Sequence, residues 1–306
     1  MISEMSDNSS SENGGSQKSA TKTSHSQIQF PTAPANAWII GDVHGCQKTL
    51  SALILEIEEH DPNPTFVFIG DLVGKGPDSL GVLDFLMNQP DRVSVLLGNH
   101  DLHLLACSYG ITKPRSSDMT QSILDLSQHH GWRKWLQNQD LVMEILSNQQ
   151  RFRLVHAGIH PQWNDQELSQ RIQEACALIR TDDWSWYKNK TSKEWETVST
   201  LTRIRCIQTS DFKPKYDYTG SPSDVPEDLS PWFKALPQRN QQAEQLTGAE
   251  SEQKPHYIFG HWARLGVHKD ENATCIDSGC VYGGELTAYQ PSTGQILHIP
   301  THESPS

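Results

Sequence analysis

Long hydrophobic runs and positive charge are both scarce in this sequence of 306 residues. No stretch reaches the roughly 18 apolar residues that a membrane-spanning helix requires, and the first residues lack the apolar core of a secretory signal. Lys and Arg number 25 against 37 Asp and Glu, which gives a net charge of -12. A protein that binds nucleic acid through a basic surface is therefore disfavoured. An acidic protein can still take an anionic substrate if bound metal ions reverse the local field.

Paired cysteines are also missing. The 6 cysteines are scattered along the chain, and none belongs to a Cys-x-x-Cys pair. Such residues usually serve as small buried hydrophobic side chains with reduced thiols, which suits the cytoplasm. Nothing in the sequence calls for a membrane or for an obligate protein partner.

The first residues of the chain contain little that could fold. They are rich in Ser, Asn, Gln, Thr and Gly, and almost nothing apolar precedes Ile28. Such a composition cannot bury enough surface to offset the entropy that is lost on ordering. We therefore expect a disordered tail over residues 1–34.

From Ala37 onward, apolar runs repeatedly end in polar residues that can bind metal ions. The runs 37–40, 65–69, 93–97, 152–155 and 256–259 lead, in that order, into Asp42 with His44, Asp71, Asn99, His156 and His261. One Gly-Asp pair after a strand is usually only a turn, and one Asn-His pair is usually a helix start. Their recurrence at successive strand ends points instead to a shared site, because ligands bind at the carboxyl ends of strands in open α/β sheets.

The candidate ligands combine carboxylate and amide oxygens with imidazole nitrogens, which suits Mn²⁺, Fe²⁺, Co²⁺ or Zn²⁺. The absence of thiolate argues against a structural zinc site. The set exceeds what one catalytic ion needs, but it suits two ions that share a carboxylate, and Asp71 is central in the series. Two such ions lower the pKa of a bridging water and hold the attacking and leaving oxygens of a phosphoryl transfer.

Further residues near these strand ends could assist such a reaction. His100 follows the candidate ligand of the third strand and is suited to act as a general acid that protonates the leaving oxygen. Asp101 could orient His100 or could cap the following helix. Lys75, and Arg203 with Arg205 if their segment is extended, could bind phosphate oxygens. The alternative for a single arginine is a surface ion pair.

Apolar strands alternate with amphipathic helical patterns, which predicts parallel pairing with right-handed crossovers. By itself this pattern favours an open, doubly wound α/β sheet. The segment 182–237 is rich in Trp and Tyr and has little periodicity, so it is either a cap over the site or a set of irregular loops held by aromatic contacts. Residues 238–254 predict a polar loop. Apolar runs at 274–277, 284–289 and 295–299 predict closing antiparallel strands.

These motifs show a resemblance to the calcineurin-like metallophosphoesterases. The resemblance rests on Gly41-Asp42-Val43-His44-Gly45, Gly70-Asp71, Gly98-Asn99-His100-Asp101, His156-Ala157-Gly158 and Gly260-His261. Longer strings are similar to one branch, the bacterial symmetrical bis(5'-nucleosyl)-tetraphosphatases; they lie at residues 98–106, 156–163, 201–205, 231–233, 259–263 and 277–284. The resemblance covers about residues 37–299.

The resemblance implies an α/β fold in which a β-sandwich is flanked by helices in an α-β-β-α arrangement. We expect one domain over residues 35–300, with a cap or lid insertion at about 165–255, and a C-terminal tail over 301–306. The implied activity is hydrolysis of diadenosine tetraphosphate, and of related dinucleoside polyphosphates, symmetrically into nucleoside diphosphates such as two ADP. Mn²⁺ is the expected metal, with Co²⁺, Fe²⁺ or Zn²⁺ as alternatives.

The resemblance also implies roles for individual residues. One metal ion would be held by Asp42, His44 and Asp71, and the other by Asp71, Asn99, His156 and His261. His100 would be the general acid. Related protein phosphatases usually have an Asp-Arg pair where this chain has Gly74 and Lys75. The small residue supports the tetraphosphatase branch, and the lysine weakens bidentate phosphate binding.

Other functions remain open on the sequence alone. A phosphoprotein phosphatase could use the same metal centre, although Gly74 counts against it. A metal-binding interaction module without turnover would carry the same ligands. RNA ends capped with a nucleoside tetraphosphate are a further candidate substrate, and the acidic charge predicts little affinity for the RNA body.

Overall fold

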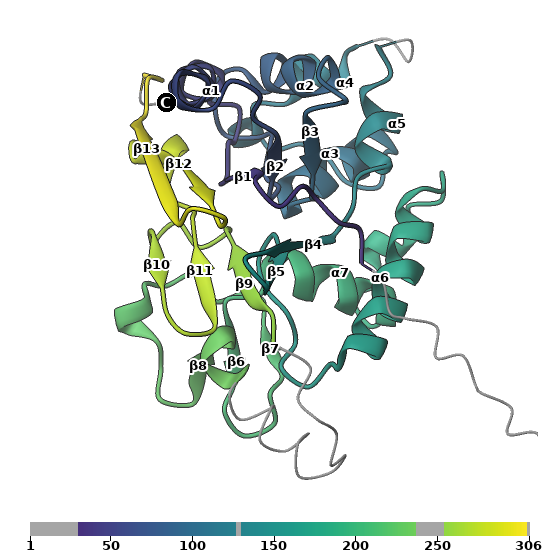
Figure 1. The fold of residues 1–306 in the computed structure, drawn as a ribbon. Coiled ribbons are helices and arrows are strands. Elements are labelled where there is room, and N and C mark those ends of the chain that lie inside the picture. Colours follow the sequence, from purple (N-terminus) through teal and green to yellow (C-terminus); the bar gives the residue numbers. More distant parts are fainter. Residues whose placement is uncertain (1–29, 127–129, 237–253, 305–306) are drawn as a thin grey trace, which may run out of the picture.

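The computed structural model describes residues 30–126, 130–236 and 254–304 (Figure 1). Most of the predicted disordered tail and of the predicted polar loop lies outside the described residues. The helices are α1 Gln47–His60, α2 Ser79–Met87, α3 Asn99–Ser108, α4 Gln121–Leu124, α5 Trp132–Gln137, α6 Asp165–Ile179 and α7 Lys193–Arg203. The strands are β1 Trp38–Ile40, β2 Phe66–Phe68, β3 Val93–Val95, β4 Val142–Ser147, β5 Gln150–Val155, β6 Cys206–Gln208, β7 Pro214–Lys215, β8 Leu229–Pro231, β9 His256–Phe259, β10 His268–Lys269, β11 Ala273–Cys275, β12 Glu285–Gln290 and β13 Gln295–Pro300.

Two 5-stranded sheets form the centre of the molecule, with strand orders β13-β12-β1-β2-β3 and β10-β11-β9-β5-β4. A small third sheet has the order β7-β6-β8. A hydrophobic cluster that draws residues from both large sheets lies between them. The β-sandwich implied by the resemblance is therefore confirmed, and the open doubly wound sheet suggested by the strand–helix alternation is not.

Alternate residues of the central strands belong to different hydrophobic clusters. In β1, Ile39 joins the cluster between the sheets, whereas Trp38 and Ile40 join the larger cluster that includes the apolar face of α1. In β2, Val67 likewise faces the other sheet. Successive side chains of a strand point to opposite faces, so a strand covered on both faces must be apolar at every position. This double burial explains the uninterrupted apolar runs in the sequence.

Each large sheet contains three neighbouring parallel strands, which are β1, β2 and β3 in one sheet and β5, β9 and β11 in the other. Predicted site residues follow the carboxyl ends of all of these strands except β11. The predicted antiparallel pairing is correct for β12 and β13. Strand β11 pairs antiparallel with β10 on one side but parallel with β9 on the other.

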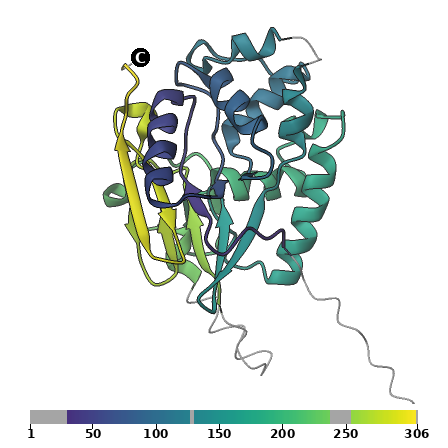
Figure 2. The ribbon, with the colours of Figure 1, turned by 45° about the horizontal axis from the view of Figure 1, so that its top comes forward.

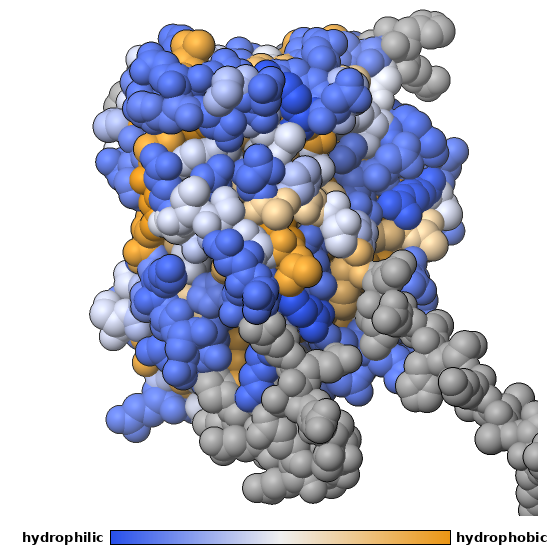
Figure 3. All heavy atoms as spheres, in the orientation of Figure 1, coloured by the Kyte–Doolittle hydropathy of each residue, from blue (hydrophilic) through white to orange (hydrophobic). Residues whose placement is uncertain are grey.

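The helices lie outside the sheets. Helix α1 packs on β12 and β13, and α6 and α7 pack on each other at the side of β4 and β5 (Figures 1 and 2). The face seen in Figure 3 is mostly hydrophilic, with hydrophobic side chains in small separate areas. Within the described ranges, none of the helices combines the length and the apolar character needed to cross a bilayer.

Strand β4, which the sequence analysis missed, forms an edge of its sheet beside β5. The described end of the predicted tail runs along this edge. The backbone N–H of Glu144 donates to the Pro31 carbonyl oxygen at 2.8 Å, and the Ala33 N–H donates to the Glu144 carbonyl oxygen at 3.0 Å. Phe30 is buried, and its ring centroid lies 4.3 Å from the Arg153 guanidinium. Residues 30–34 are thus packed against the domain.

Arg153 in β5 has a fully buried side chain, and its guanidinium bonds both Glu144 and Asp165. Removal of a buried cation from such a network typically costs about 3–5 kcal/mol, because charges are left without their partner.

The substitution Arg153→Met should lower the free energy of unfolding by about 3 kcal/mol in denaturant titrations. This value lies at the lower end of the range because the two carboxylates are partly exposed and water can still solvate them. Arg151 bonds the same carboxylates from a partly exposed position and is the matched control. Arg151→Met should cost about 1 kcal/mol or less, and equal losses would contradict this account.

Candidate active site

One pocket of about 760 Å³ gathers most of the predicted site residues. Its lining includes Asp42, His44, Asp71, Lys75, Asn99, His100, Arg203, Arg205 and His261. His156 is fully buried behind the lining, with its Nε2 3.5 Å from the Oδ2 of Asp71. Asp101 is also fully buried and is not part of the lining. A pocket of this volume is within the range of sites for small organic ligands.

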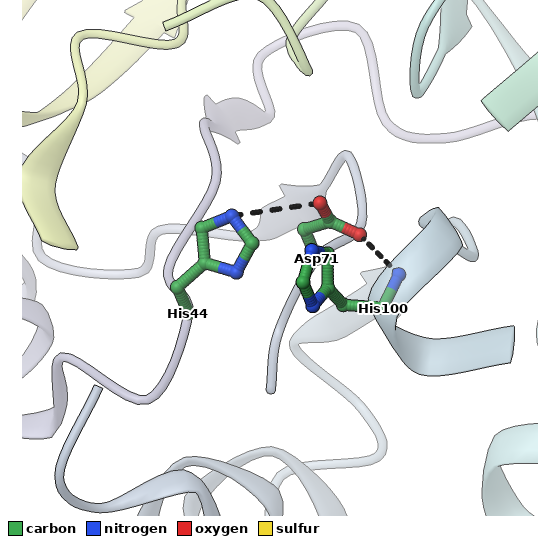
Figure 4. A group of neighbouring side chains, drawn as sticks. All are labelled: His44, Asp71 and His100. Atoms are coloured by element: carbon green, nitrogen blue, oxygen red, sulfur yellow. Dashed lines mark hydrogen bonds and ion pairs between the residues drawn. The ribbon is translucent and has the colours of Figure 1, made fainter. Parts of the chain in front are cut away.

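Asp71, just after β2, lies at the centre of the cluster. Its Oδ2 is 3.5 Å from the Nε2 of His44 and 3.5 Å from the Nε2 of His156, so one oxygen stands between imidazoles that come from different sheets. Its Oδ1 accepts a 2.8 Å hydrogen bond from the backbone N–H of His100 (Figure 4). The carboxylate is therefore placed where the sequence analysis expects the shared ligand.

Three imidazoles of the cluster each contact a backbone carbonyl through one ring nitrogen. The pairs are His44 Nδ1 with the Val73 oxygen at 3.3 Å, His156 Nδ1 with the Ile69 oxygen at 2.9 Å and His261 Nε2 with the Arg203 oxygen at 3.1 Å. Because a carbonyl only accepts, the bonded nitrogen carries the proton and the other nitrogen is available as a ligand. Such second bonds are typical of histidines that bind metal ions. The backbone N–H of His261 also donates to both oxygens of Asp42 at 3.2 Å, which ties the two sheets together.

Burial and charge separate the pKa values in this cluster. Burial by itself raises the pKa of Asp71, but the imidazoles of His156, His100 and His44 outweigh it and hold that pKa well below its usual value. Burial lowers the pKa of His44 to about 3. Burial raises the pKa of Asp42. Burial by itself lowers the pKa of His156, but the charges of Asp71 and Asp42 outweigh it and raise that pKa to about 9. Asp71 and His44 are therefore in the protonation states in which they bind metal ions, whereas Asp42 and His156 would release protons on binding one.

Backbone strain is concentrated in the same place. His44, Asp71, Lys75 and His261 have positive φ angles of 49°, 50°, 66° and 64°. Residues other than glycine rarely adopt this left-handed conformation, which costs about 1–3 kcal/mol each. Strain of this kind persists where the surrounding structure enforces it, and it clusters at ligand sites. The positions of strained backbone therefore point to the same candidate ligand site as the arrangement of the side chains.

The two predicted arginines reach the pocket, although their segment is not a strand. Arg203 is the last residue of α7 and Arg205 immediately precedes β6, with the extended and buried Ile204 between them. Arg203 donates to the Tyr187 hydroxyl at 3.0 Å, and Arg205 donates to the His261 carbonyl oxygen at 2.7 Å. These bonds orient both guanidinium groups, and each group has five N–H donors in all, so it can also bind an anionic ligand.

The family model for the calcineurin-like phosphoesterases matches residues 35–264, which is well over half of the chain. The chain belongs to the calcineurin-like phosphoesterase family. The symmetrical bis(5'-nucleosyl)-tetraphosphatase of Janthinobacterium sp. (strain Marseille) is 32% identical over 286 residues, covering 88% of this chain and 98% of the relative. That of Vibrio cholerae serotype O1 (strain ATCC 39541) is 34% identical over 265 residues, covering 82% and 93%. The crystal structure of a protein assigned as a diadenosine tetraphosphatase shares the fold, with a TM-score of 0.59, 23% identity and coverage of 90% of this chain and 100% of that chain.

Members of this phosphoesterase family use divalent metal ions, and the residues present fit such ions. Asn99 Oδ1 and His156 Nε2 are buried without a hydrogen-bond partner among the described residues. A buried polar atom without a partner typically costs about 1–3 kcal/mol, and coordination to a metal ion would satisfy both atoms. Carboxylate, amide and imidazole donors without thiolate suit a divalent first-row ion.

Asp101 caps a helix rather than orienting His100. Its Oδ2 accepts from the Gly98 N–H at 2.8 Å, at the start of α3, and its Oδ1 accepts from the Leu72 N–H at 3.0 Å. Burial and the neighbouring charge of Asp71 raise the pKa of Asp101 to about 7. The Asp101 side chain therefore links the loop after β2 to the start of α3, the two segments that carry Asp71 and Asn99.

Gly74 stands where related phosphatases carry an aspartate, and the backbone here is unsuited to a side chain. Its φ is +94°, and a Cβ would lie 2.9 Å from the Nδ1 of His100. We expect Gly74→Ala to lower the free energy of unfolding by about 1–3 kcal/mol and also to lower kcat, because His100 must move. Denaturant titration and steady-state kinetics measure the two effects.

Gly110 supplies the matched control for this substitution. It has a φ of +69°, but a Cβ there would meet nothing within 4 Å. Gly110→Ala should therefore carry a similar backbone penalty and leave kcat unchanged. Equal losses of kcat in the two variants would show that the space beside His100 is unimportant.

The pocket lining includes residues that were not predicted as functional candidates, and Asp277 and Tyr282 are the most notable of them. Asp277 follows β11, is buried and lines the pocket. Its signal was available, because it ends an apolar run as the predicted ligands do, but that run was assigned to an antiparallel strand. Tyr282 also lines the pocket, yet it is exposed. No spacing rule singles out such a residue in the sequence.

Proposed function

We propose that this protein hydrolyses dinucleoside tetraphosphates at the central phosphoanhydride and converts diadenosine 5',5'''-P1,P4-tetraphosphate into two ADP. The observation that carries the proposal is the nearly full-length match to relatives named symmetrical bis(5'-nucleosyl)-tetraphosphatases. The cluster around Asp71 and the pocket of about 760 Å³ beside it supply a site of suitable chemistry and size. The glycine at position 74 also favours this substrate class over phosphoproteins.

The proposed cofactors are two divalent ions, with Mn²⁺ as the proposed metal and Co²⁺, Fe²⁺ or Zn²⁺ as alternatives. The proposed ligands of one ion are Asp42, His44 and Asp71, and those of the other are Asp71, Asn99, His156 and His261. When bound, the ions supply Lewis-acid polarisation of the phosphoryl group and activation of the attacking water.

The remaining roles belong to side chains that border the pocket. His100, whose ring centroid is 4.8 Å from that of His44, is the proposed general acid. Burial lowers the pKa of His100, and an approaching polyanion favours its protonated form, so that a proton is available for the leaving diphosphate oxygen. Arg203 and Arg205, together with Lys75, offset the charge of the substrate phosphates.

The segment from α6 to residue 236 is proposed to act as a cap over the site. It contributes Arg203, Arg205, Tyr216 and Thr219 to the pocket wall. The cap would therefore bring its own phosphate-binding cations to a metal centre that is built by the two large sheets. In this arrangement the cap would bind the substrate phosphates, whereas the two large sheets would position the metal-binding residues.

The cysteines support a cytoplasmic location. All 6 are free, and Cys107 alone among them is not buried. Thiols of this kind persist in a reducing compartment.

A comparison of substrates tests the proposed function. The protein is loaded with Mn²⁺, and kcat/KM is measured for diadenosine tetraphosphate and for a phosphoserine peptide. We expect the dinucleotide to be preferred by at least about tenfold, which corresponds to about 1.4 kcal/mol in transition-state binding. Removal of the metal with a chelator should abolish the activity, and Mn²⁺ should restore it. A preference for the phosphopeptide would assign the site to a protein phosphatase instead.

The same chemistry extends to RNA ends that carry a nucleoside-tetraphosphate cap. The net charge of -12 predicts that the RNA body adds little affinity. Turnover of capped RNAs should therefore depend weakly on RNA length.

A further inference from the structure

Tyr282 is an exposed aromatic side chain on the wall of the candidate active site. Its exposed fraction is 63%, and few large hydrophobic side chains of the described residues are as accessible. It ends the short 3-10 turn Cys280–Tyr282, which lies between the left-handed residues Gly279 and Gly283. An aromatic ring normally contributes stability through burial, so a ring left in solvent at a ligand site indicates a role in binding.

The turn that carries Tyr282 is fixed by backbone hydrogen bonds and by a buried neighbouring residue. The Tyr282 N–H donates to the Gly279 carbonyl oxygen at 2.9 Å, and the Gly284 N–H donates to the same oxygen at 3.0 Å. Cys280 is buried, and its Sγ lies within 4.8 Å of the Sγ of Cys46 in the loop after β1. The ring is therefore presented on a fixed backbone, which reduces the entropy lost when a ligand binds.

Lys75 connects Tyr282 with the metal-binding cluster. Its ammonium contacts the Tyr282 hydroxyl and lies 4.7 Å from the ring centroid. It is also near His44 and His100, whose pKa values are lowered by burial and further by this charge. An anion bound at Lys75 would thus have the catalytic histidines on one side and the aromatic ring on the other. In a nucleotide the phosphate adjoins the nucleoside that carries the base, so a phosphate bound at Lys75 could place its base at the Tyr282 ring.

The other aromatic side chains in the described pocket wall are engaged elsewhere. Trp262 is 2% exposed, and its Nε1 donates to the Gly220 carbonyl oxygen at 3.1 Å. The Tyr216 hydroxyl lies 2.8 Å from the Thr200 hydroxyl, and its ring packs edge-on against Trp195 at 5.4 Å between centroids. Tyr282 is the one whose ring stands in solvent.

We propose that Tyr282 stacks on a nucleobase of the substrate while Lys75 binds the adjoining phosphate. The inference rests on the proposed function for its physiological ligand, but it requires only that a nucleotide occupies the pocket. Stacking on an aromatic face tolerates every base, so this platform favours nucleotides over bare polyphosphate without reading base identity. The ligand class is a nucleoside diphosphate unit, which is half of the proposed substrate.

Calorimetric titration of the Mn²⁺-loaded protein with ADP and with inorganic pyrophosphate tests the proposal. We expect Tyr282→Ala to weaken ADP binding at least about fivefold more than pyrophosphate binding, the smallest loss expected for one base–aromatic stack. Tyr282→Phe keeps the ring and should recover most of the ADP affinity. Leu146, which is 64% exposed and does not line the pocket, is the control, and Leu146→Ala should bind both ligands like the unmodified protein.

Three outcomes would overturn the platform. They are undiminished ADP binding by Tyr282→Ala, equal losses for ADP and pyrophosphate, and no ADP binding by the unmodified protein. Equal losses would mean that the residue acts through Lys75 on phosphate. Suppose that Tyr282→Ala selectively loses ADP binding but the unmodified protein does not cleave diadenosine tetraphosphate. That result would uphold the platform and reject only the proposed function. If the unmodified protein cleaves the dinucleotide but Tyr282→Ala shows no selective loss of ADP binding, the proposed function is upheld and the platform is rejected.

Discussion

Replacement of Asp71 by Asn should lower kcat for diadenosine tetraphosphate by at least about a thousandfold. One oxygen of this carboxylate lies 3.5 Å from imidazole nitrogens of both sheets. In the proposed mechanism the Asp71 carboxylate is a ligand of both metal ions. Metal-supplied charge stabilisation is worth several kcal/mol, and each 1.36 kcal/mol is a factor of ten in rate. The Asp71→Asn protein should also retain fewer than two Mn²⁺ ions per chain when its metal content is measured after gel filtration.

The control for Asp71→Asn is the same change at an exposed carboxylate. Asp125 follows α4, accepts a 2.7 Å hydrogen bond from the Gln121 side chain and does not line the pocket. Asp125→Asn should keep its activity and its metal content. A melting temperature for Asp71→Asn close to that of the unmodified protein would show that the loss is not due to unfolding. Full activity of Asp71→Asn would remove the bridging carboxylate from the account.

Replacement of His100 by Asn should lower kcat by about 10²–10⁴-fold, the usual contribution of general acid–base catalysis. The His100 side chain borders the pocket, whereas its backbone N–H, which Asn retains, bonds Asp71. Metal content and KM should therefore change little. The measurement is steady-state kinetics together with metal analysis of the same protein.

His103 in the same helix is the matched control for His100. Its Nε2 lies 3.1 Å from the Oδ2 of Asp118, and it does not line the pocket. His103→Asn should retain kcat within a few fold. If His100→Asn loses its metal ions, His100 is a ligand rather than an acid. If it keeps full kcat, the leaving group departs without help from this side chain.

The grouping of the candidate ligands could be predicted from the sequence because these residues follow a simple rule. Each predicted ligand stands directly after an apolar strand, and parallel strands present such ends on one side of a sheet. The structure places Asp42, Asp71 and His261 on one pocket and His156 against it. The apolar runs were long enough to locate these strands because both faces of the strands are buried.

The packing of the sheets could not be predicted from the alternation of strands and helices alone. Ile39 and Val67 face a second sheet, but a helix layer would bury the same side chains, so the residues do not distinguish a sandwich from an open sheet. The resemblance to a known family supplied that distinction. Strand β4 was missed because Glu144 interrupts its apolar run and because Leu146 is apolar at an exposed position, so its residues follow neither a continuous nor an alternating pattern.

Contacts between distant segments set the roles that the sequence left open. Asp101 had two candidate roles, and the choice depends on the loop at Leu72, which lies 29 residues away in the chain. Arg203 and Arg205 reach the pocket from a helix end rather than from a strand. Tyr282 is recognised only when its exposure and its contact with Lys75 are known.

Product analysis after incubation with diadenosine tetraphosphate is the most direct test of the central claim. The Mn²⁺-loaded protein is stopped at early times, and the nucleotides are separated by anion-exchange chromatography. The account predicts ADP as the sole nucleotide product, which requires cleavage at the central anhydride. AMP together with ATP, or no cleavage of the dinucleotide, would contradict it.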